Sequence, residues 1–174
     1  MKILSPFKFC PRCASPKITS HLEHGIQCKA CDLIYFHNTA AGVAAIIEIE
    51  DKILLLKRSN DPKKGFLDFP GGFVDYHESF DMALVREIRE ELNIEICDVR
   101  YFGSWHNEYQ YKDVAYFAAD AYFLCKPKDM STLKLSDEND SYVIIDPLKV
   151  NDTDMAFPPM VTMLNKYRLT KSGR

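Results

Sequence analysis

The stretch that decides the fold opens with Pro70-Gly71-Gly72 and closes with Arg86-Glu87-Ile88-Arg89-Glu90-Glu91-Leu92-Asn93-Ile94. The proline and the two glycines mark a break in regular structure. Beyond them, apolar residues recur with a helical period. At roughly 100° per residue they share an arc of about 100°, and they are Leu84, Val85, Ile88 and Leu92. The sequence therefore predicts an amphipathic helix over residues 78–92, entered from a glycine turn.

Three carboxylates share one face of this predicted helix. Glu87, Glu90 and Glu91 are spaced i, i+3 and i+4, so their side chains are neighbours on adjacent turns. Like charges this close destabilise an isolated helix by about 0.2–0.5 kcal/mol per pair. A cluster of oxygen ligands offsets that repulsion when it binds Mg²⁺ or Mn²⁺. Because Arg86 and Arg89 flank the cluster, a solvated face with ordinary ion pairs is the alternative interpretation.

The sequence predicts β-strands both before and after this helix. Two apolar runs joined at Glu50-Asp51 predict a hairpin of Gly42–Glu50 and Lys52–Lys57, and residues 59–72 are expected to form a loop. Further strands are expected over Ile94–Trp105, Val114–Leu124 and Tyr142–Ile145, and a closing helix over Pro158–Arg168. Strands outnumber helices, so an α/β (α+β) fold with a mixed sheet covered by helices is predicted.

Four cysteines lie in two pairs near the N-terminus. Cys10-Pro-Arg-Cys13 and Cys28-Lys-Ala-Cys31 are separated by fourteen residues. This spacing is typical of a Cys₄ zinc site, and four sulfur ligands leave Zn²⁺ no open position, so the metal would be structural. It would replace the core that residues 1–38 can scarcely build alone. A pair of disulfides or four unconnected thiols are the alternatives; the reducing interior of a cell disfavours disulfides, and the repeated Cys-x-x-Cys spacing disfavours unconnected thiols.

Length and charge limit the class of protein. A chain of 174 residues suggests one main domain with a small appendage, and we expect a division into residues 1–38 and 39–174. The formal charge is −3, whereas generic nucleic-acid binders carry a positive excess, so a nucleic-acid partner is not expected. No apolar run reaches the roughly 18–20 residues that span a bilayer. Residues 1–10 do not resemble a signal peptide, so we expect a cytoplasmic protein with no membrane partner.

The spacing around the carboxylates closely resembles the box of the Nudix hydrolase family, G-x5-E-x7-R-E-U-x-E-E-x-G-U, where U is a bulky aliphatic residue. Gly72, Glu78 and the segment from Arg86 to Ile94 match every defined position except the late glycine, where Asn93 stands. Asn tolerates the left-handed backbone best after glycine, so the departure is mild. Two cysteine pairs ahead of such a box are similar to the zinc-ribbon subgroup, which is NADH pyrophosphatase-like or ADP-ribose pyrophosphatase-like.

The resemblance implies a Nudix α/β/α sandwich behind a zinc ribbon, and Mg²⁺- or Mn²⁺-dependent hydrolysis of a nucleoside diphosphate-linked substrate. Glu87, Glu90 and Glu91 would be metal ligands together with the backbone carbonyl of Gly71, and Glu87 or Glu91 would be the base. Glu78 would pair with Arg86 and fix the loop against the helix, with Gly72 supporting the turn. Glu138 is a candidate for a further catalytic carboxylate, with an ordinary acidic loop as the alternative.

The substrate predicted from the resemblance is ADP-ribose, NADH or a similar dinucleotide. The absence of proline between Gly72 and Cys125 counts against a dedicated NAD(H) or ADP-ribose enzyme. Trp105, Tyr109 and Tyr111 could stack a nucleobase, although aromatic residues on strands more often pack against neighbouring strands. A nucleoside triphosphate pyrophosphohydrolase, and a non-catalytic nucleotide-sensing module whose zinc ribbon binds nucleic acid, are the alternatives. A homodimer is a further expectation from the resemblance.

Overall fold

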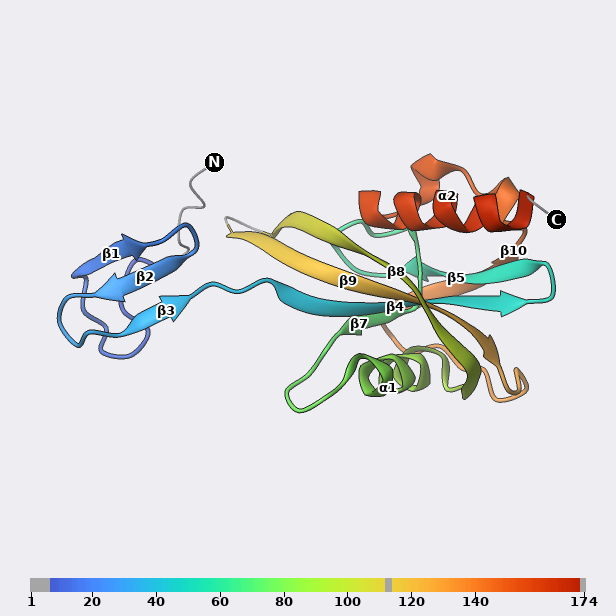
Figure 1. Ribbon diagram of the computed structural model, residues 1–174. Coiled ribbons are helices and arrows are strands. Elements are labelled where there is room, and N and C mark those ends of the chain that lie inside the picture. Colours follow the sequence, from blue (N-terminus) through green and yellow to red (C-terminus); the bar gives the residue numbers. More distant parts are fainter. Residues whose placement is uncertain (1–6, 112–113, 173–174) are drawn as a thin grey trace.

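The computed structural model describes residues 7–111 and 114–172, but not the side chains of residues 109–111 and 172. The N-terminal part is a small antiparallel sheet in the order β1-β2-β3, formed by Ile18–His21, Gly25–Cys28 and Ile34–Phe36. Figure 1 shows it apart from the rest of the molecule, joined to it by residues 37–39. The division that the sequence predicts after residue 38 falls between this sheet and the next.

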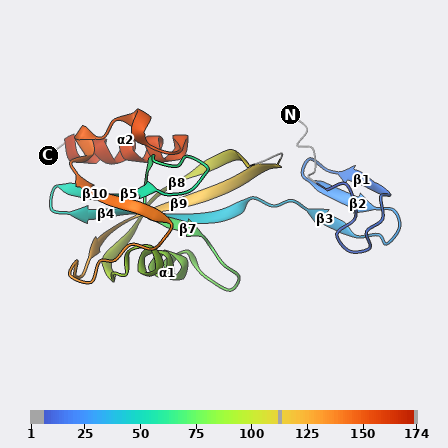
Figure 2. The same cartoon turned by 180° about the vertical axis from the view of Figure 1, so that it is seen from behind.

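The rest of the chain is built on a seven-stranded mixed sheet. Its main path is β10-β5-β4-β9-β8, formed by Asn139–Ile145, Lys52–Arg58, Ala40–Ile49, Val114–Pro127 and Ile96–Tyr111. Among the strands that the structure describes, β4 and β9 are the one pair that runs parallel. Helix α1 (Phe80–Leu92) covers one face and α2 (Pro158–Ser172) the other, as Figures 1 and 2 show from opposite sides. The predicted α/β/α sandwich is confirmed.

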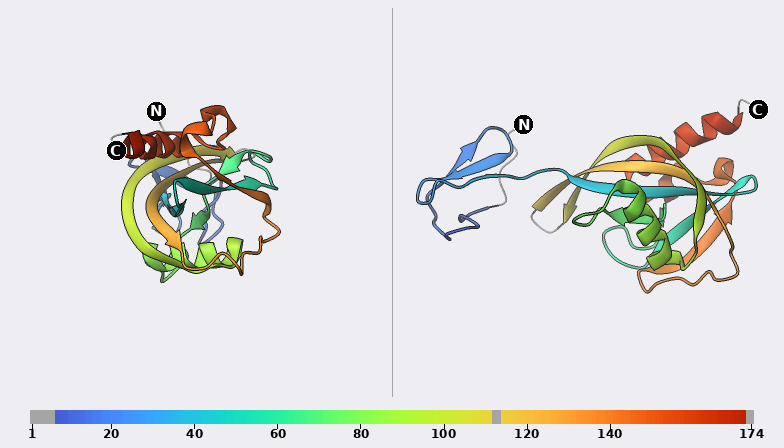
Figure 3. Two further views of the ribbon diagram at one scale, coloured as in Figure 1. Left: turned by 90° about the vertical axis from the view of Figure 1, so that its right-hand side faces the viewer. Right: turned by 60° about the horizontal axis from the view of Figure 1, so that its bottom comes forward.

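The central strand β4 explains why this sheet needs a helix on each face. All residues from Gly42 to Ile47 are buried. Val43, Ala45 and Ile47 pack in one cluster with residues of α1, and Ala44 and Ile46 pack in a second cluster with residues of α2. Successive side chains of a strand point to opposite faces, so an uninterrupted apolar run belongs to a strand that is covered on both sides. Figure 3 shows the twisted sheet between the two helices.

The segment 59–72 differs from the predicted loop, because it contains two short strands. β6 (Leu67–Asp68) pairs with β5, and β7 (Gly71–Phe73) pairs with β4. Gly71 has a φ of 147°, and a Cβ at this residue would lie 2.1 Å from the carbonyl oxygen of Val43. Only glycine lets the two backbones approach so closely. Glycine disfavours strands in general, which is why the sequence pattern missed β7.

Most other boundaries differ from the prediction by a few residues. α1 begins at Phe80 rather than residue 78, because Ser79 caps it and accepts a hydrogen bond from the backbone N–H of Met82 (3.3 Å). β8 starts at Ile96 and continues to Tyr111, β9 ends at Pro127, and α2 extends to Ser172. The hairpin of β4 and β5 is confirmed, with Ile47 opposite Leu54. Neither α1 nor α2, the two α-helices of the described chain, is long and apolar enough to cross a membrane.

The C-terminal cap of α1 confirms the expectation for Asn93. Its φ of 53° and ψ of 36° are left-handed, and its backbone N–H donates to the carbonyl of Arg89 (2.9 Å). Its side-chain Nδ2 donates to the carbonyl of Thr132 (2.8 Å), which ties the helix end to the loop after β9. The residue thus replaces glycine and adds a tertiary hydrogen bond.

We expect Asn93→Ala to lower the free energy of unfolding by about 1–2 kcal/mol, because alanine tolerates the left-handed backbone poorly and cannot bond to Thr132. Asn93→Gly should be close to neutral, since relief of backbone strain offsets the lost hydrogen bond. Urea denaturation of the two variants measures the difference. Equal losses would show that the left-handed cap does not limit stability.

Candidate active site

The carboxylates of α1 lie against the glycines of β7. A Cβ at Gly72 would lie 2.5 Å from Oε1 of Glu87, so the missing side chain makes room for that carboxylate. One residue earlier, the backbone N–H of Gly71 donates to Oε2 of Glu91 (2.8 Å). The box glycine thus leaves space that the carboxylate of Glu87 occupies, and β7 is held between β4 and α1.

Glu91 is the carboxylate most strongly affected by its surroundings. Its Oε1 accepts a hydrogen bond from Nδ2 of Asn139 (3.1 Å), in addition to the bond from Gly71. Burial raises the pKa of Glu91 to about 8, and the negative charges of Asp68 and Glu87 contribute to the rise. Crowded, desolvated carboxylates of this kind are favoured partners for a divalent cation.

Glu87 and Glu90 face Arg86. Nη1 of Arg86 donates to Oε1 of Glu87 (2.8 Å) and to Oε2 of Glu90 (3.1 Å). Burial raises the pKa of Glu87 despite this partner, and the charges of Glu90 and Glu138 add to the rise. Glu138, exposed in the loop before β10 and close enough to act on Glu87, is therefore part of the same acidic group.

The three glutamates of the box do not converge on one point in this structure. Glu91 is turned to Gly71 and Asn139, whereas Glu87 and Glu90 are turned to Arg86. Within the described residues, the four N-terminal cysteines are the one set of three or more metal-ligating side chains that already gathers closely. A cation held by all three glutamates would have to draw two of them away from Arg86.

Arg86 also clamps the loop that precedes α1. Its Nε and Nη2 donate to the two carboxylate oxygens of Glu78 (2.7 and 2.8 Å), so the expected pair is present and bidentate. Nη2 donates in addition to the carbonyl of Phe73 (3.0 Å) at the end of β7. One guanidinium thus joins the helix, the loop and the glycine strand.

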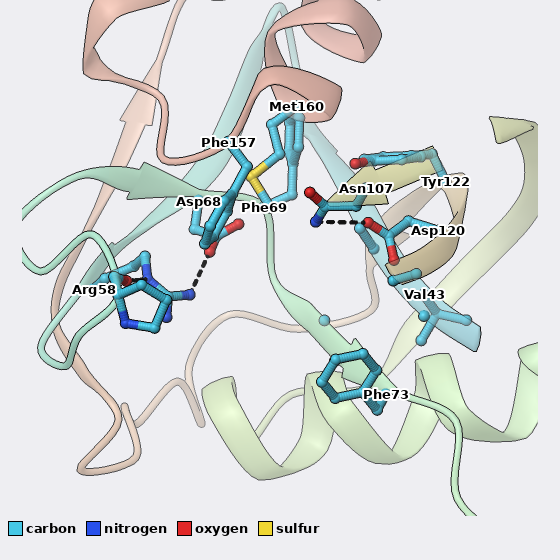
Figure 4. Close-up of a pocket in the computed structure, with 16 residues that line it drawn as sticks. Val43, Arg58, Asp68, Phe69, Phe73, Asn107, Asp120, Tyr122, Phe157 and Met160 are labelled. Carbon is cyan, nitrogen blue, oxygen red and sulfur yellow. Dashed lines mark hydrogen bonds and ion pairs between the residues drawn. The ribbon is translucent and has the colours of Figure 1, made fainter. Parts of the chain in front are cut away.

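Two hollows meet beside these carboxylates. The first, which we call the acidic hollow, has a volume of about 270 Å³, and its lining includes Glu91, Glu138 and Asn139. The second, which we call the aromatic pocket, has a volume of about 180 Å³, and residues of β4, β9 and α2 are among its lining residues. They share four lining residues: Arg58, Asp68, Phe69 and Gly71. Figure 4 shows the aromatic pocket.

Sequence reasoning missed the ion pair at this junction. Nη1 of Arg58 donates to Oδ2 of Asp68 (2.7 Å), and burial raises the pKa of Asp68 to about 6 against the effect of Arg58. The available signal was a single acidic residue between Leu67 and Phe69 in an otherwise apolar run, since buried carboxylates need a partner. Asn139 was also missed, and so were Asn107 and Asp120 of the aromatic pocket.

Of the aromatic candidates on β8, only the side chain of Trp105 belongs to the described residues, and it is not brought to the carboxylates. Trp105 is 44% exposed and stacks on His106, with 5.6 Å between the ring centroids. It is not among the residues that line either hollow. The side chains of Tyr109 and Tyr111 lie outside the described residues, so their proposed stacking stays a prediction.

The four cysteines form a separate cluster around β2. All four Sγ atoms lie within 4.8 Å of one another, and both the Cys10–Cys31 and the Cys13–Cys28 sulfur distances are 3.7 Å. A tetrahedral metal with bonds of about 2.3 Å to sulfur sets its ligands roughly 3.8 Å apart. The same distances are far too long for disulfides, and all four cysteines are free. The donor set therefore fits a tetrahedral metal ion.

Comparison with known families agrees with this geometry. The NUDIX domain model matches residues 37–161, and the NADH pyrophosphatase zinc ribbon domain model matches residues 7–36. The NAD-capped RNA hydrolase NudC of Vibrio atlanticus is 28% identical over 97 residues, which cover 56% of this chain and 36% of that protein. An ADP-ribose pyrophosphatase of Methanocaldococcus jannaschii is 49% identical over 61 residues, covering 35% of this chain and 36% of that protein. The matched region thus spans about a third of each relative.

Solved structures share the fold. A NUDIX hydrolase from Nitrosomonas europaea superposes with a TM-score of 0.72 at 23% identity, covering 92% of this chain and 90% of that one. The NUDIX domain of Shewanella oneidensis NrtR, complexed with ADP ribose, has a TM-score of 0.61 at 18% identity, covering 77% and 90%. Both likenesses concern the architecture.

The contact between Gly72 and Glu87 can be tested by a double-mutant cycle. Gly72→Ala should cost about 1–3 kcal/mol of stability, because its methyl group collides with the carboxylate. In a Glu87→Ala background most of this loss should disappear, since the space is then free. Chemical denaturation of the four proteins gives the coupling energy. Additive losses would show that the two residues do not touch.

Proposed function

The chain belongs to the Nudix family, and from this premise we propose that it is a metal-dependent pyrophosphohydrolase. Its substrate would be a nucleoside diphosphate joined to a further group, such as ADP-ribose, NADH or a similar dinucleotide. The observation that carries the proposal is the group of carboxylates beside the glycines of β7, where burial and, to a lesser extent, neighbouring negative charges raise the pKa of Glu91 and of Glu87. The names of the two relatives, an NAD-capped RNA hydrolase and an ADP-ribose pyrophosphatase, support this substrate class.

The carboxylates of α1 and the backbone of β7 together offer a donor set that fits Mg²⁺ or Mn²⁺. Carboxylate and carbonyl oxygens are the ligands these ions prefer, and Glu87, Glu90, Glu91 and the carbonyl of Gly71 would supply them. When bound, the cation would compensate the charge of the diphosphate and acidify a water molecule. An acidic protein can take an anionic substrate in this way.

The surrounding residues would position this machinery. Gly71 and Asn139 hold the two oxygens of Glu91, which fixes the orientation of that carboxylate. Arg86 binds Glu78 through Nε and Nη2 and binds Glu87 and Glu90 through Nη1. The bonds from Nη1 could therefore break when a cation binds, while the bonds to Glu78 keep the loop in place. Glu87 or Glu91 would accept the proton of the attacking water. Glu138 would be a further carboxylate at the edge of the hollow.

The four cysteines would hold Zn²⁺ as a structural metal. Their sulfur distances match a closed tetrahedral site, which leaves no position for a reacting water. Between residues 7 and 36 the buried apolar side chains are those of Cys10, Ile26 and Cys28. The metal would thus take the place of a hydrophobic core.

Two alternatives are separated from the proposal by one experiment. A nucleoside triphosphate pyrophosphohydrolase would release pyrophosphate, whereas a diphosphate-linked substrate yields monophosphates. A sensing module would bind nucleotides without turnover, and its zinc ribbon would bind RNA in a salt-dependent manner. A panel of ADP-ribose, NADH, nucleoside triphosphates and RNA with an NAD 5′ end, with Mg²⁺ or Mn²⁺ and product identification, decides among them. The cytoplasmic location and the homodimer stay predictions.

Glu91→Gln should lower turnover by more than about 100-fold while the fold is kept, because an amide of the same shape cannot ionise to become a carboxylate ligand when the metal binds. The matched control is Glu95→Gln, which changes an exposed carboxylate just beyond α1 that pairs with Arg89. Steady-state rates and circular dichroism of both variants make the comparison. Near-normal turnover of Glu91→Gln would show that the metal is placed wrongly.

Removal of zinc should loosen residues 7–36 before the larger sheet. We expect a strong chelator to expose that segment to limited proteolysis, with the first cuts mapped there by mass spectrometry. Cys28→Ser should have the same effect without chelator. Cleavage of the larger sheet ahead of the N-terminal part would contradict a structural role for the cysteines.

A further inference from the structure

The aromatic pocket contains polar groups that neither the carboxylates of α1 nor the cysteines explain. It lies on the α2 face of the sheet, where Phe69, Phe157 and Met160 contribute apolar walls. Figure 4 shows Asn107, Asp120 and Tyr122 gathered on one side of the pocket, with Asp68 and Arg58 on the other. Its volume of about 180 Å³ is below the roughly 300–1,000 Å³ that hold a whole drug-sized ligand, so it suits one part of a dinucleotide.

The hydrogen bond between Asn107 and Asp120 determines which atoms stay free. Nδ2 of Asn107 donates to Oδ2 of Asp120 (3.3 Å), and a carboxylate can only accept, so the amide oxygen of Asn107 points elsewhere. This Oδ1 atom is buried and has no partner among the described residues; the same holds for the hydroxyl of Tyr122. Tyr122 is fully buried. Buried polar groups almost always have a partner, and leaving one without costs about 1–3 kcal/mol.

The strand beneath the pocket leaves room for the carboxylate. Gly42 of β4 lies opposite Asp120 of β9, and a Cβ at Gly42 would lie 2.3 Å from Oδ1 of Asp120. The glycine therefore lets the charged group lie close to the sheet while the hydroxyl of Tyr122 is buried nearby. Two acceptors, the amide oxygen of Asn107 and the carboxylate of Asp120, are thus fixed by strand register at the same end of an apolar pocket.

We infer that this pocket binds a purine base through its exocyclic amino group. The flat base would lie between the apolar walls, and the two N–H groups of the amine would donate to Asn107 and Asp120. A base with a carbonyl oxygen in place of the amine would place a hydrogen-bond acceptor opposite the acceptor atoms of Asn107 and Asp120, so neither of these two hydrogen bonds could form. The inference rests on the proposed function, because the shared lining residues Asp68 and Gly71 would let a nucleotide extend from this pocket to the carboxylates of the acidic hollow.

The test compares nucleotides that differ only in this group. AMP and IMP, and GMP and XMP, are titrated into the full-length protein by calorimetry, and kcat/KM is measured for ADP-ribose and its hypoxanthine analogue. We expect at least one amino nucleotide to bind about 10-fold or more tightly than its oxo counterpart, because a site built to accept hydrogen bonds rejects the analogue that lacks the donors. The two pairs distinguish adenine from guanine.

Two variants test the residues. Asp120→Asn keeps the shape but replaces one acceptor with a donor, so the amino-to-oxo ratio should fall by about 10-fold or reverse. Asn107→Leu removes the other acceptor and should also reduce the ratio. The control Asp51→Asn changes an exposed carboxyl group in the turn between β4 and β5 and should leave the ratio unchanged.

The outcomes separate this inference from the proposed function. Equal binding of amino and oxo nucleotides by the wild-type protein, or an unchanged ratio in Asp120→Asn, overturns the base assignment even if turnover is normal. A clear amino preference in binding, without hydrolysis of any substrate, supports the pocket and overturns the proposed hydrolase. Loss of the preference in both Asp120→Asn and Asn107→Leu, but not in Asp51→Asn, supports the assignment.

Discussion

The absence of side chains at Gly71 and Gly72 is the constraint on which the site depends. It lets the backbone of β7 pair with β4 on one side and touch the carboxylates of α1 on the other. A methyl group at either position would meet the carbonyl of Val43 or the carboxylate of Glu87 at 2.1–2.5 Å. The carboxylates of α1 can therefore lie directly against the backbone of β7 because both residues are glycines.

Positive charges hold the carboxylates around α1 close together. Arg86 bonds to Glu78, Glu87 and Glu90 at once, and Arg58 bonds to Asp68, which also lines the acidic hollow. Even so, burial and mutual repulsion raise the pKa of Glu91 to about 8. The fold thus holds acidic groups closer than their charges alone would allow, which is the situation that a divalent cation relieves.

The two faces of the sheet divide the tasks that we propose. α1 carries the carboxylates on one face, and the pocket beside α2 on the other face has apolar walls and a few fixed hydrogen-bond acceptors. The two hollows meet at the residues they share, among them Asp68 and Gly71. The segment from β6 to β7 would therefore connect the hydrolytic site at the carboxylates with the pocket that binds the base. The cysteine cluster organises a separate small sheet.

The sequence by itself determines the features that residues close together in the chain encode. The spacing of apolar residues predicts α1 and the β4–β5 hairpin, and both are present. The two cysteine pairs predict a metal-binding cluster, and the sulfur distances fit one. Asn93 is expected in a left-handed helix cap, which the structure contains. The tertiary structure alone decided the strand at Gly71–Phe73, the partnership of Arg58 with Asp68, and the meeting of Asn107 with Asp120. These contacts depend on which strands pair and in what register. Register is set by burial on both faces of the whole sheet, so no local pattern of residues contains it.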